Sequence, residues 1–174
     1  MKLRCELHVN GGMRKVVMVA RPNEPGEHLA HKLAALVLFW DYDPIIDASV
    51  KTPALADYEF LPDLLSLDEG GEVRLWVECG SVTLHKLKKL TRRLPAARIV
   101  VMKETEREAA RLRKDLEEQL ARQEKVEIFA WPGTSFRDWA GTVGEKTEIF
   151  GEGNGHLINA VVNERPVVAE MRSF

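Results

Sequence analysis

The sequence has little cysteine and no long apolar run. Only two of its 174 residues are cysteine, and Cys5 and Cys79 stand far apart among strand-forming residues. This spacing fits neither a structural disulfide nor a thiolate metal site. No stretch approaches the roughly 20 apolar residues of a membrane span, and MKLRCELHVN alternates charge with apolar residues instead of building a signal-peptide core. These absences argue against a secreted disulfide scaffold and a membrane partner, and they predict a soluble cytoplasmic protein in a reducing compartment.

An overall charge of one sign is also lacking. The 25 Lys and Arg and 27 Asp and Glu give a formal charge of −2. Between residues 82 and 114, however, eleven Lys or Arg stand against three Glu, a local charge of +8, so the remainder of the chain carries −10. This asymmetry permits the basic helices around Lys86 and Lys114 to face an anionic partner such as nucleic acid. The simpler alternative is a pair of solvated helices whose charges partly offset one another.

The hydrophobic patterns predict one compact α/β domain over residues 1–174, because the chain has ordinary domain length and is 45% hydrophobic. Asn10-Gly11-Gly12 separates two period-two segments, the signature of a β-hairpin. Helical spacing predicts helices over residues 26–40, 83–94 and 104–123. Strands are predicted over residues 44–51, 58–67, 72–80, 97–103, 126–131, 147–153, 157–163 and 166–173. This order indicates a mixed sheet with helices packed on it.

A carboxylate interrupts the apolar strand WVECG. Strand alternation puts Val73, Leu75 and Val77 on one face and Arg74, Trp76 and Glu78 on the other. A short turn brings the preceding strand back antiparallel, so Asp63 lies on the strand next to that of Glu78. Two carboxylates on adjacent strands suit a hard divalent ion such as Mg²⁺. Alternatively, Asp63 is a turn or edge residue and Glu78 pairs with Arg74 or with a helix lysine.

Three segments resemble the successive signatures of the YaeQ family. RPNEPGEHLAHKLAALVLFW carries a Pro-x-Glu-x-x-Glu helix start followed by a basic residue and Leu-x-Ala. FLPDLLSLDEGGEVRLWVECG carries a Pro-Asp dipeptide and a Trp-Val-Glu-x-Gly strand, and HKLKKL carries a Lys-Lys pair. The resemblance covers roughly residues 1 to 130 and is weakest around FAWPGTSFRDWAG.

This resemblance implies a PD-(D/E)XK nuclease-like fold with an αβββαβ core, a mixed central sheet flanked by helices, and an added N-terminal β-hairpin and C-terminal strands. The implied site residues are Glu27, with Glu24 as its neighbour, Asp63 and Glu78. Gly80 departs from the pattern, because it stands where the superfamily has a lysine that activates water and stabilises the phosphorane.

A lysine from the next helix can reach the same volume. Lys86, Lys88 and Lys89 are the candidates, and Lys86 lies one turn into the helix, nearest the end of the strand of Glu78. We therefore predict that Lys86 takes this role. The alternative is that all three lysines form a solvated, anion-attracting face.

Other polar and aromatic residues are interpreted as structural. His28 and His31 stand three apart on the first helix without a third zinc ligand, so we expect surface or satisfied histidines. His85 fits a surface residue of the basic helix. Trp131 and Trp139 offer stacking faces for bases, but such residues more often fill the core edge.

The sequence therefore predicts a nucleic-acid-associated protein with a degenerate phosphodiesterase site that uses Mg²⁺ or Mn²⁺. Asp63 and Glu78 are the predicted ligands, Glu27 is an outer ligand, and Lys86 orients water or stabilises charge. The alternative is a non-catalytic regulatory or protein-interaction module on the same fold. Gly80 and the overall negative charge favour that alternative.

Overall fold

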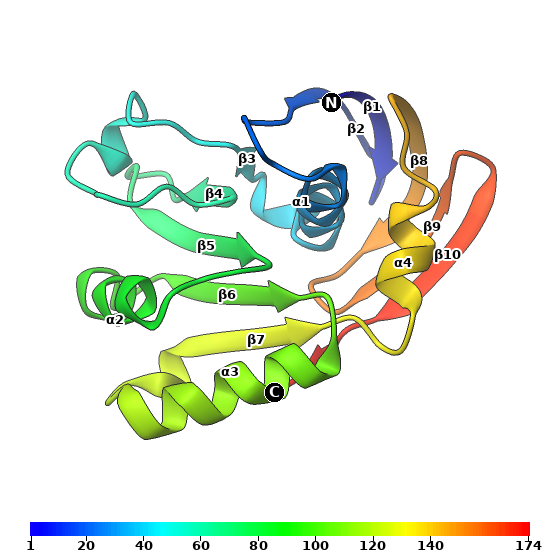
Figure 1. Ribbon diagram of the computed structural model, residues 1–174. Coiled ribbons are helices and arrows are strands. Elements are labelled where there is room, and N and C mark those ends of the chain that lie inside the picture. The colour runs from blue at the N-terminus through cyan, green and yellow to red at the C-terminus, as the bar shows by residue number, and fades with distance from the viewer.

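A computed structural model describes residues 1–174 as two mixed β-sheets and four α-helices (Figure 1). The α-helices are α1 (Gly26–Leu38), α2 (Leu84–Arg93), α3 (Glu106–Gln119) and α4 (Ser135–Ala140). The strands are β1 (Lys2–Val9), β2 (Gly12–Val19), β3 (Ile45–Ile46), β4 (Leu64–Leu67), β5 (Val73–Cys79), β6 (Arg98–Lys103), β7 (Val126–Ala130), β8 (Lys146–Gly153), β9 (Leu157–Val162), β10 (Arg165–Glu170) and β11 (Arg172–Ser173).

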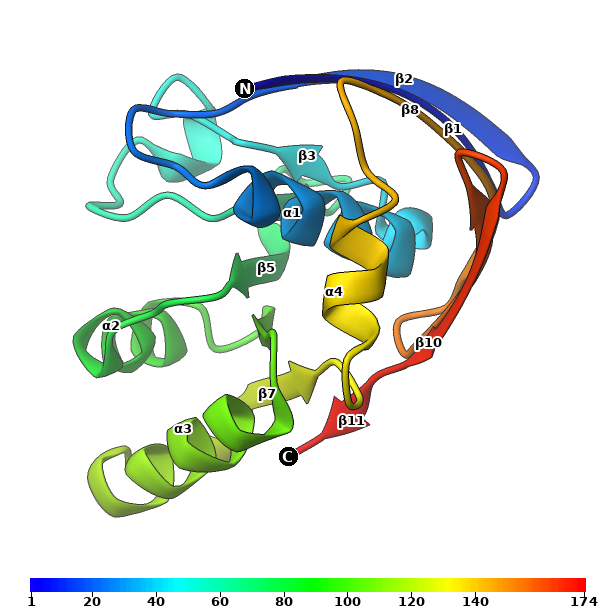
Figure 2. The ribbon, with the colours of Figure 1, turned by 45° about the vertical axis from the view of Figure 1, so that its right-hand side comes forward.

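The elements form layers. The central sheet has the strand order β11-β7-β6-β5-β4-β3, and the outer sheet has the order β10-β9-β8-β1-β2. Figure 2 shows α1 and α4 between the two sheets, with α2 and α3 on the other face of the central sheet. Each face of the central sheet accordingly has its own apolar core, one shared with the outer sheet and α1, the other with α2 and α3.

The predicted hairpin forms at Asn10 and Gly11, which both adopt positive φ angles, 50° and 77°, as tight hairpin turns require. Its β1 strand then pairs in parallel with β8, near the other end of the chain. The hairpin and the terminal strands therefore build a sheet of their own, whereas the sequence patterns predicted one mixed sheet.

Helix α1 is the centre of the fold. Ten consecutive residues, Leu29 to Leu38, are buried, and all but His31 and Lys32 are apolar. A helix that is apolar on nearly all sides is stable only when it is covered all round. The helix is predicted over residues 26–40 and ends at Leu38, after which a short 3₁₀ turn follows.

Two strand predictions were too long. Residues 44–51 contain only the two-residue β3, because Asp47 turns the chain with a positive φ of 51°. Residues 58–67 contain only β4, which begins after Pro62 and Asp63. Proline has no N–H to donate to a neighbouring strand, so the ladder cannot run back through it.

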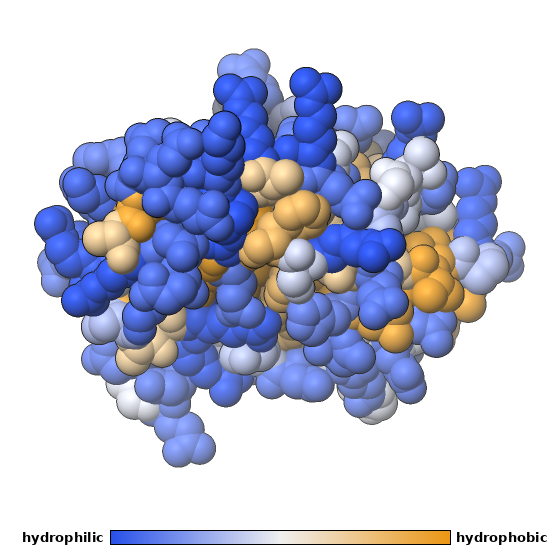
Figure 3. All heavy atoms as spheres, turned by 90° about the horizontal axis from the view of Figure 1, so that it is seen from below, coloured by the Kyte–Doolittle hydropathy of each residue, from blue (hydrophilic) through white to orange (hydrophobic).

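Helices α2 and α3 begin at side-chain caps. The hydroxyl of Thr83 accepts the Lys86 N–H, and Thr105 and Glu108 form a reciprocal capping box. The side of the molecule that carries these helices is largely hydrophilic, with smaller apolar areas (Figure 3). None of the helices combines the length and the apolar character needed to cross a bilayer.

Candidate functional site

A pocket of about 550 Å³ opens at the carboxyl end of β5 in the central sheet. It lies between the segment that enters α1, the end of β5 and the first turns of α2 and α3. The predicted site residues Glu27, Asp63, Glu78 and Lys86 all line it. Its carboxylates are Glu24, Glu27, Asp63, Glu78, Glu104 and Glu108.

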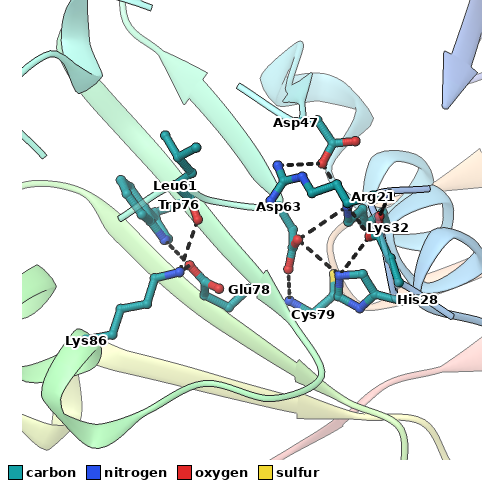
Figure 4. Close-up of polar contacts among 11 residues, drawn as sticks. Arg21, His28, Lys32, Asp47, Leu61, Asp63, Trp76, Glu78, Cys79 and Lys86 are labelled. Atoms are coloured by element: carbon teal, nitrogen blue, oxygen red, sulfur yellow. Dashed lines mark hydrogen bonds and ion pairs between the residues drawn. The ribbon is translucent and has the colours of Figure 1, made fainter. Parts of the chain in front are cut away.

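Asp63 is held in place just before β4. Its backbone N–H donates to the Val77 carbonyl at 3.1 Å, which fixes it opposite the end of β5. The Cys79 N–H donates to its Oδ2 at 2.8 Å, and His28 Nε2 lies 3.2 Å from its Oδ1 (Figure 4). Burial works to raise the pKa of Asp63, but the bonds from His28 and the Cys79 N–H, with the charge of Lys32, outweigh it and lower the pKa. Asp63 is therefore ionised at neutral pH.

Glu78 occupies a different environment on the neighbouring strand. Its side chain is almost fully buried, and its Oε1 accepts the Trp76 indole N–H at 2.6 Å and lies 2.5 Å from Lys86 Nζ. Burial raises the pKa of Glu78, against the lowering effects of Lys86 and Trp76. Asp63 and Glu78 thus have pKa values displaced in opposite directions.

Arg74 does not share the face of Glu78. Ser66 pairs with Leu75 but Leu67 pairs with Val73, so a bulge inserts Arg74 as an extra residue. Arg74 consequently donates to the Ser66 hydroxyl at 2.9 Å and to the Tyr42 carbonyl. Val73 packs instead in the core of Trp76, on the face opposite to the one predicted. The period-two assignment was wrong here because the bulge breaks the alternation.

The cationic partner of Glu78 is a helix lysine. Lys86 Nζ also donates to the Leu61 carbonyl at 3.1 Å, so its ammonium is held between the strand and the loop before Asp63. Lys89 pairs with Glu59 instead, and Lys88 is exposed. Of the three candidate lysines, only Lys86 lines the pocket.

The conformation of Gly80 explains why no lysine follows Glu78 on its strand. Gly80 has a φ of +77°, in the left-handed region that disfavours side chains. Its carbonyl accepts a hydrogen bond of 2.6 Å from Lys103 Nζ on the neighbouring β6. Burial lowers the pKa of Lys103. The strand of Glu78 therefore ends in a left-handed turn at Gly80, and a lysine at this position would have a strained backbone.

Two further members of the site come from α1. Lys32 is fully buried, and its Nζ lies 2.6 Å from Glu24 Oε1, 2.7 Å from Asp47 Oδ1 and 3.7 Å from Asp63 Oδ1. His28, treated as a surface or satisfied residue in the sequence, contacts Asp63 and lies 3.4 Å from Glu24. A lysine in the apolar run HKLAALVLFW is a signal that could have revealed this network, because a buried lysine requires anionic partners.

Glu104 and Glu108 were also missed by sequence reasoning. They follow β6, which runs parallel to β5 as its direct neighbour, and the carboxyl ends of such strands meet at one edge of a sheet. Burial, followed by the charges of Glu108 and Glu27, raises the pKa of Glu104. Mutual repulsion among these carboxylates makes the pocket favourable for a cation.

His31 is buried, in contrast to its predicted place on the surface or in a satisfied network. Both of its ring nitrogens and the indole nitrogen of Trp131 are buried without a hydrogen-bond partner. The ring packs against Phe136, with centroids 4.9 Å apart. Trp131 and Trp139 are fully buried, so these rings fill the core and are not accessible to bases.

More than half of the cations in the basic segment, residues 82–114, make contacts within the protein. Six of its eleven cations contact carboxylates, carbonyls or aromatic rings: Lys86, Lys89, Arg93, Arg98, Lys103 and Arg113. The other five are exposed and have no such partner: Lys88, Arg92, Arg107, Arg111 and Lys114.

The donor set of the pocket suits a hard cation. All its anionic groups are carboxylates, and Glu27 is exposed without a hydrogen-bond partner. The ligand atoms of Glu27, Asp63 and Glu78 do not all lie within 4.8 Å of one another. The one group of three side chains that meets this spacing lies on the outer sheet. Direct contact of all three with one ion would therefore require side-chain movement, whereas an ion that keeps several of its waters, as Mg²⁺ commonly does, needs fewer direct protein ligands.

The fold and the pocket define a mixed α/β protein of two sheets with a carboxylate-lined pocket at the edge of its central sheet. The family model described as YaeQ protein matches residues 13–149, and the chain belongs to the YaeQ family.

Crystal structures of YaeQ proteins share this fold. The YaeQ protein from Xanthomonas axonopodis pv. citri superposes with a TM-score of 0.75 at 16% identity, over 99% of this chain and 96% of that one. The YaeQ protein from Pseudomonas syringae gives a TM-score of 0.71 at 15% identity, over 99% of this chain and 94% of that one. No curated protein matches the chain in sequence.

Proposed function

We propose that the chain is a metal-dependent phosphodiesterase that acts on nucleic acid with Mg²⁺ or Mn²⁺. The observation that carries the proposal is the convergence of Glu27, Asp63, Glu78 and Lys86 in one pocket. They come from α1, the segment before β4, β5 and α2. Such a set of carboxylates with one lysine is suited to phosphodiester hydrolysis.

The order of elements supports a PD-(D/E)XK-like core. From α1 to β6 the chain runs helix, three strands, helix, strand. Glu27 lies at the start of the first helix, Asp63 directly precedes the second strand, and Glu78 lies near the end of the third. The lysine of the site is then contributed by α2, because the left-handed turn at Gly80 removes it from the strand.

Each residue has a role that follows from its contacts. Asp63, ionised and held by His28 and the Cys79 N–H, is a fixed oxygen ligand. Glu78 would be the second ligand, and Glu27 would help to hold the ion as an outer ligand. A bound Mg²⁺ lowers the pKa of its water and neutralises phosphoryl oxygens. Lys86 holds Glu78 in place and presents positive charge to the anionic transition state.

The exposed cations bind the substrate. Lys88 and Arg92 stand four residues apart on α2, on the same helix as Lys86. Together with Arg107, Arg111 and Lys114 on α3, they offer contacts to the phosphate backbone without a sequence preference.

A second candidate is a non-catalytic interaction module. Glu78 Oε1 is already bonded to Lys86 and Trp76, and Asp63 is bonded through both oxygens. A network of this kind is electrostatically complete without a metal. The carboxylates would then act as structural residues that hold α1, β5 and α2 together.

Cleavage of plasmid and of single- and double-stranded oligonucleotides in Mg²⁺ and Mn²⁺ distinguishes the two. The variants are Asp63→Asn and Glu78→Gln, with Glu72→Gln as the matched control, because Glu72 is an exposed carboxylate in the turn before β5. The phosphodiesterase proposal predicts cleavage that is lost in both site variants and kept in the control. No cleavage by the wild type in either metal contradicts it, and cleavage that persists unchanged in both site variants belongs to a contaminant.

A further inference from the structure

A second cluster of metal-ligating side chains lies on the outward face of the outer sheet, away from the pocket. It consists of Glu6 and His8 on β1 and Glu148 on β8, and one ligand atom from each lies within 4.8 Å of the others. No other group of three such side chains in the chain meets this spacing.

The strand register builds the cluster. Glu6 and His8 stand two apart on β1 and therefore share a face. In the parallel pairing of β1 with β8, Glu6 is opposite Glu148 and His8 is opposite Phe150. Two sequence-distant strands thus bring two carboxylates and one imidazole to a single point.

The imidazole of His8 is already oriented. Its ring stacks on Phe150 with centroids 4.5 Å apart and an interplanar angle of 6°. This stacking directs Nε2 to within 3.0 Å of Glu6 Oε1. Two ligands of a tetrahedral zinc ion, each about 2.0–2.1 Å from the metal, lie about 3.3 Å apart. The observed separation of His8 Nε2 from Glu6 Oε1 is close to that spacing, so these two ligands need only a small shift, while the Glu148 ligand atom lies within 4.8 Å of both.

The surroundings leave room for an ion. Lys15 pairs with Oε2 of Glu6 at 3.2 Å, so Oε1 faces His8. The carboxylate of Glu148 makes no hydrogen bond or ion pair and is exposed. The side chains of His8 and Glu6 are 35% and 40% exposed, which admits water to the remaining coordination positions.

We propose that Glu6, His8 and Glu148 form a site for a divalent transition-metal ion of the zinc class. A mixed set of imidazole and carboxylate donors favours Zn²⁺ over Mg²⁺, whereas the all-oxygen pocket has the opposite preference. The ion bridges β1 and β8, and it therefore cross-links two neighbouring strands that are far apart in the sequence. Because such an ion binds the folded chain and not the separated strands, it stabilises the outer sheet.

The test is isothermal titration calorimetry of the full chain with Zn²⁺, alongside thermal unfolding with and without the metal. We expect one zinc per chain and a raised unfolding midpoint. His8→Gln and Glu148→Gln are expected to weaken binding by at least about tenfold, which is the effect of losing even a supporting partner of a metal ligand. His85→Gln, at an exposed histidine on α2, is the matched control and is expected to bind as the wild type does.

Two further variants separate this site from the others. Lys15→Gln removes the competing cation and is expected to tighten zinc binding. Asp63→Asn disables the pocket and keeps Glu6, His8 and Glu148, so zinc bound by this variant is bound at the cluster, and the two proposals are tested separately. The proposal is overturned if the wild type binds no zinc, or if His8→Gln and His85→Gln bind it equally. In either case the cluster is a surface ion-pair network of Lys15, Glu6 and His8.

Discussion

Replacing His31 with leucine should weaken the dependence of folding stability on acid. His31 is fully buried, neither ring nitrogen has a hydrogen-bond partner, and burial is the main cause that lowers its pKa from 6.5 to about 3. Because the unfolded chain binds this proton more readily than the folded chain, protonation favours unfolding. Above pH 6.5 His31 is neutral in both states and does not reduce the unfolding free energy. As the pH falls from 6.5 toward 3, the unfolding free energy falls, because only the unfolded chain takes up the proton.

The magnitude follows from that shift. Each unit of pKa corresponds to about 1.4 kcal/mol, so between pH 6.5 and pH 4.5 the wild type loses up to about 3 kcal/mol of unfolding free energy through His31. The charged groups around His31, which are His28, Asp63 and Lys103, remain in the variant. The opposing shifts of Asp63 and Glu78 also remain, so they cancel in the difference between the two proteins.

The assay is urea unfolding of the wild type and His31→Leu at pH 7.5, 6.5, 5.5 and 4.5. The variant should be as stable as the wild type at pH 7.5 or about 1 kcal/mol more stable, because two unpartnered polar atoms are removed. At pH 4.5 it should be clearly the more stable protein. His85→Leu, at an exposed histidine, is the control. Equal pH slopes for the wild type and His31→Leu would refute this account of the buried ring.

Three further predictions concern the pocket and its surroundings. Lys86→Met should cost about 3–5 kcal/mol at pH 7.5, since it leaves the buried Glu78 carboxylate without its cation, and the loss in urea unfolding should shrink at pH 5 as Glu78 takes up a proton. Gly80→Lys should destabilise by about 1–2 kcal/mol because of the left-handed backbone and not because of a clash, since the nearest atom to an added Cβ is His28 Nδ1 at 3.8 Å; Gly80→Asn should cost clearly less. In fluorescence anisotropy with labelled DNA, Lys88→Gln combined with Arg92→Gln should reduce the salt slope of binding by about 2, and an unchanged slope, or an equal effect of the exposed Lys51→Gln, would remove α2 from the proposed interface.

Local signals were sufficient for several parts of the fold. Asn10-Gly11 correctly predicted the hairpin, and the short turn before β5 correctly brought the segment of Asp63 beside the strand of Glu78. Lys86 could be selected from three lysines because it stands in the first turn of α2, nearest the end of that strand.

Non-local features could not be read from the sequence in the same way. The parallel pairing of β1 with β8 joins segments about 140 residues apart, and no local pattern specifies such a partner. The bulge at Arg74 reverses a face without changing the residue types around it. The network of Lys32 with Glu24 and Asp47 depends on a loop that was predicted as a strand.

The central claim is that the carboxylate pocket binds a divalent metal. An anomalous difference map from a crystal soaked in Mn²⁺ tests it most directly, because manganese replaces magnesium and can be located. The account predicts a peak in the pocket within roughly 2.0–2.5 Å of oxygens of Asp63 and Glu78, with Lys86 Nζ beside Glu78, and no such peak in Asp63→Asn. A fully soaked wild-type crystal without a peak at these two residues would contradict it.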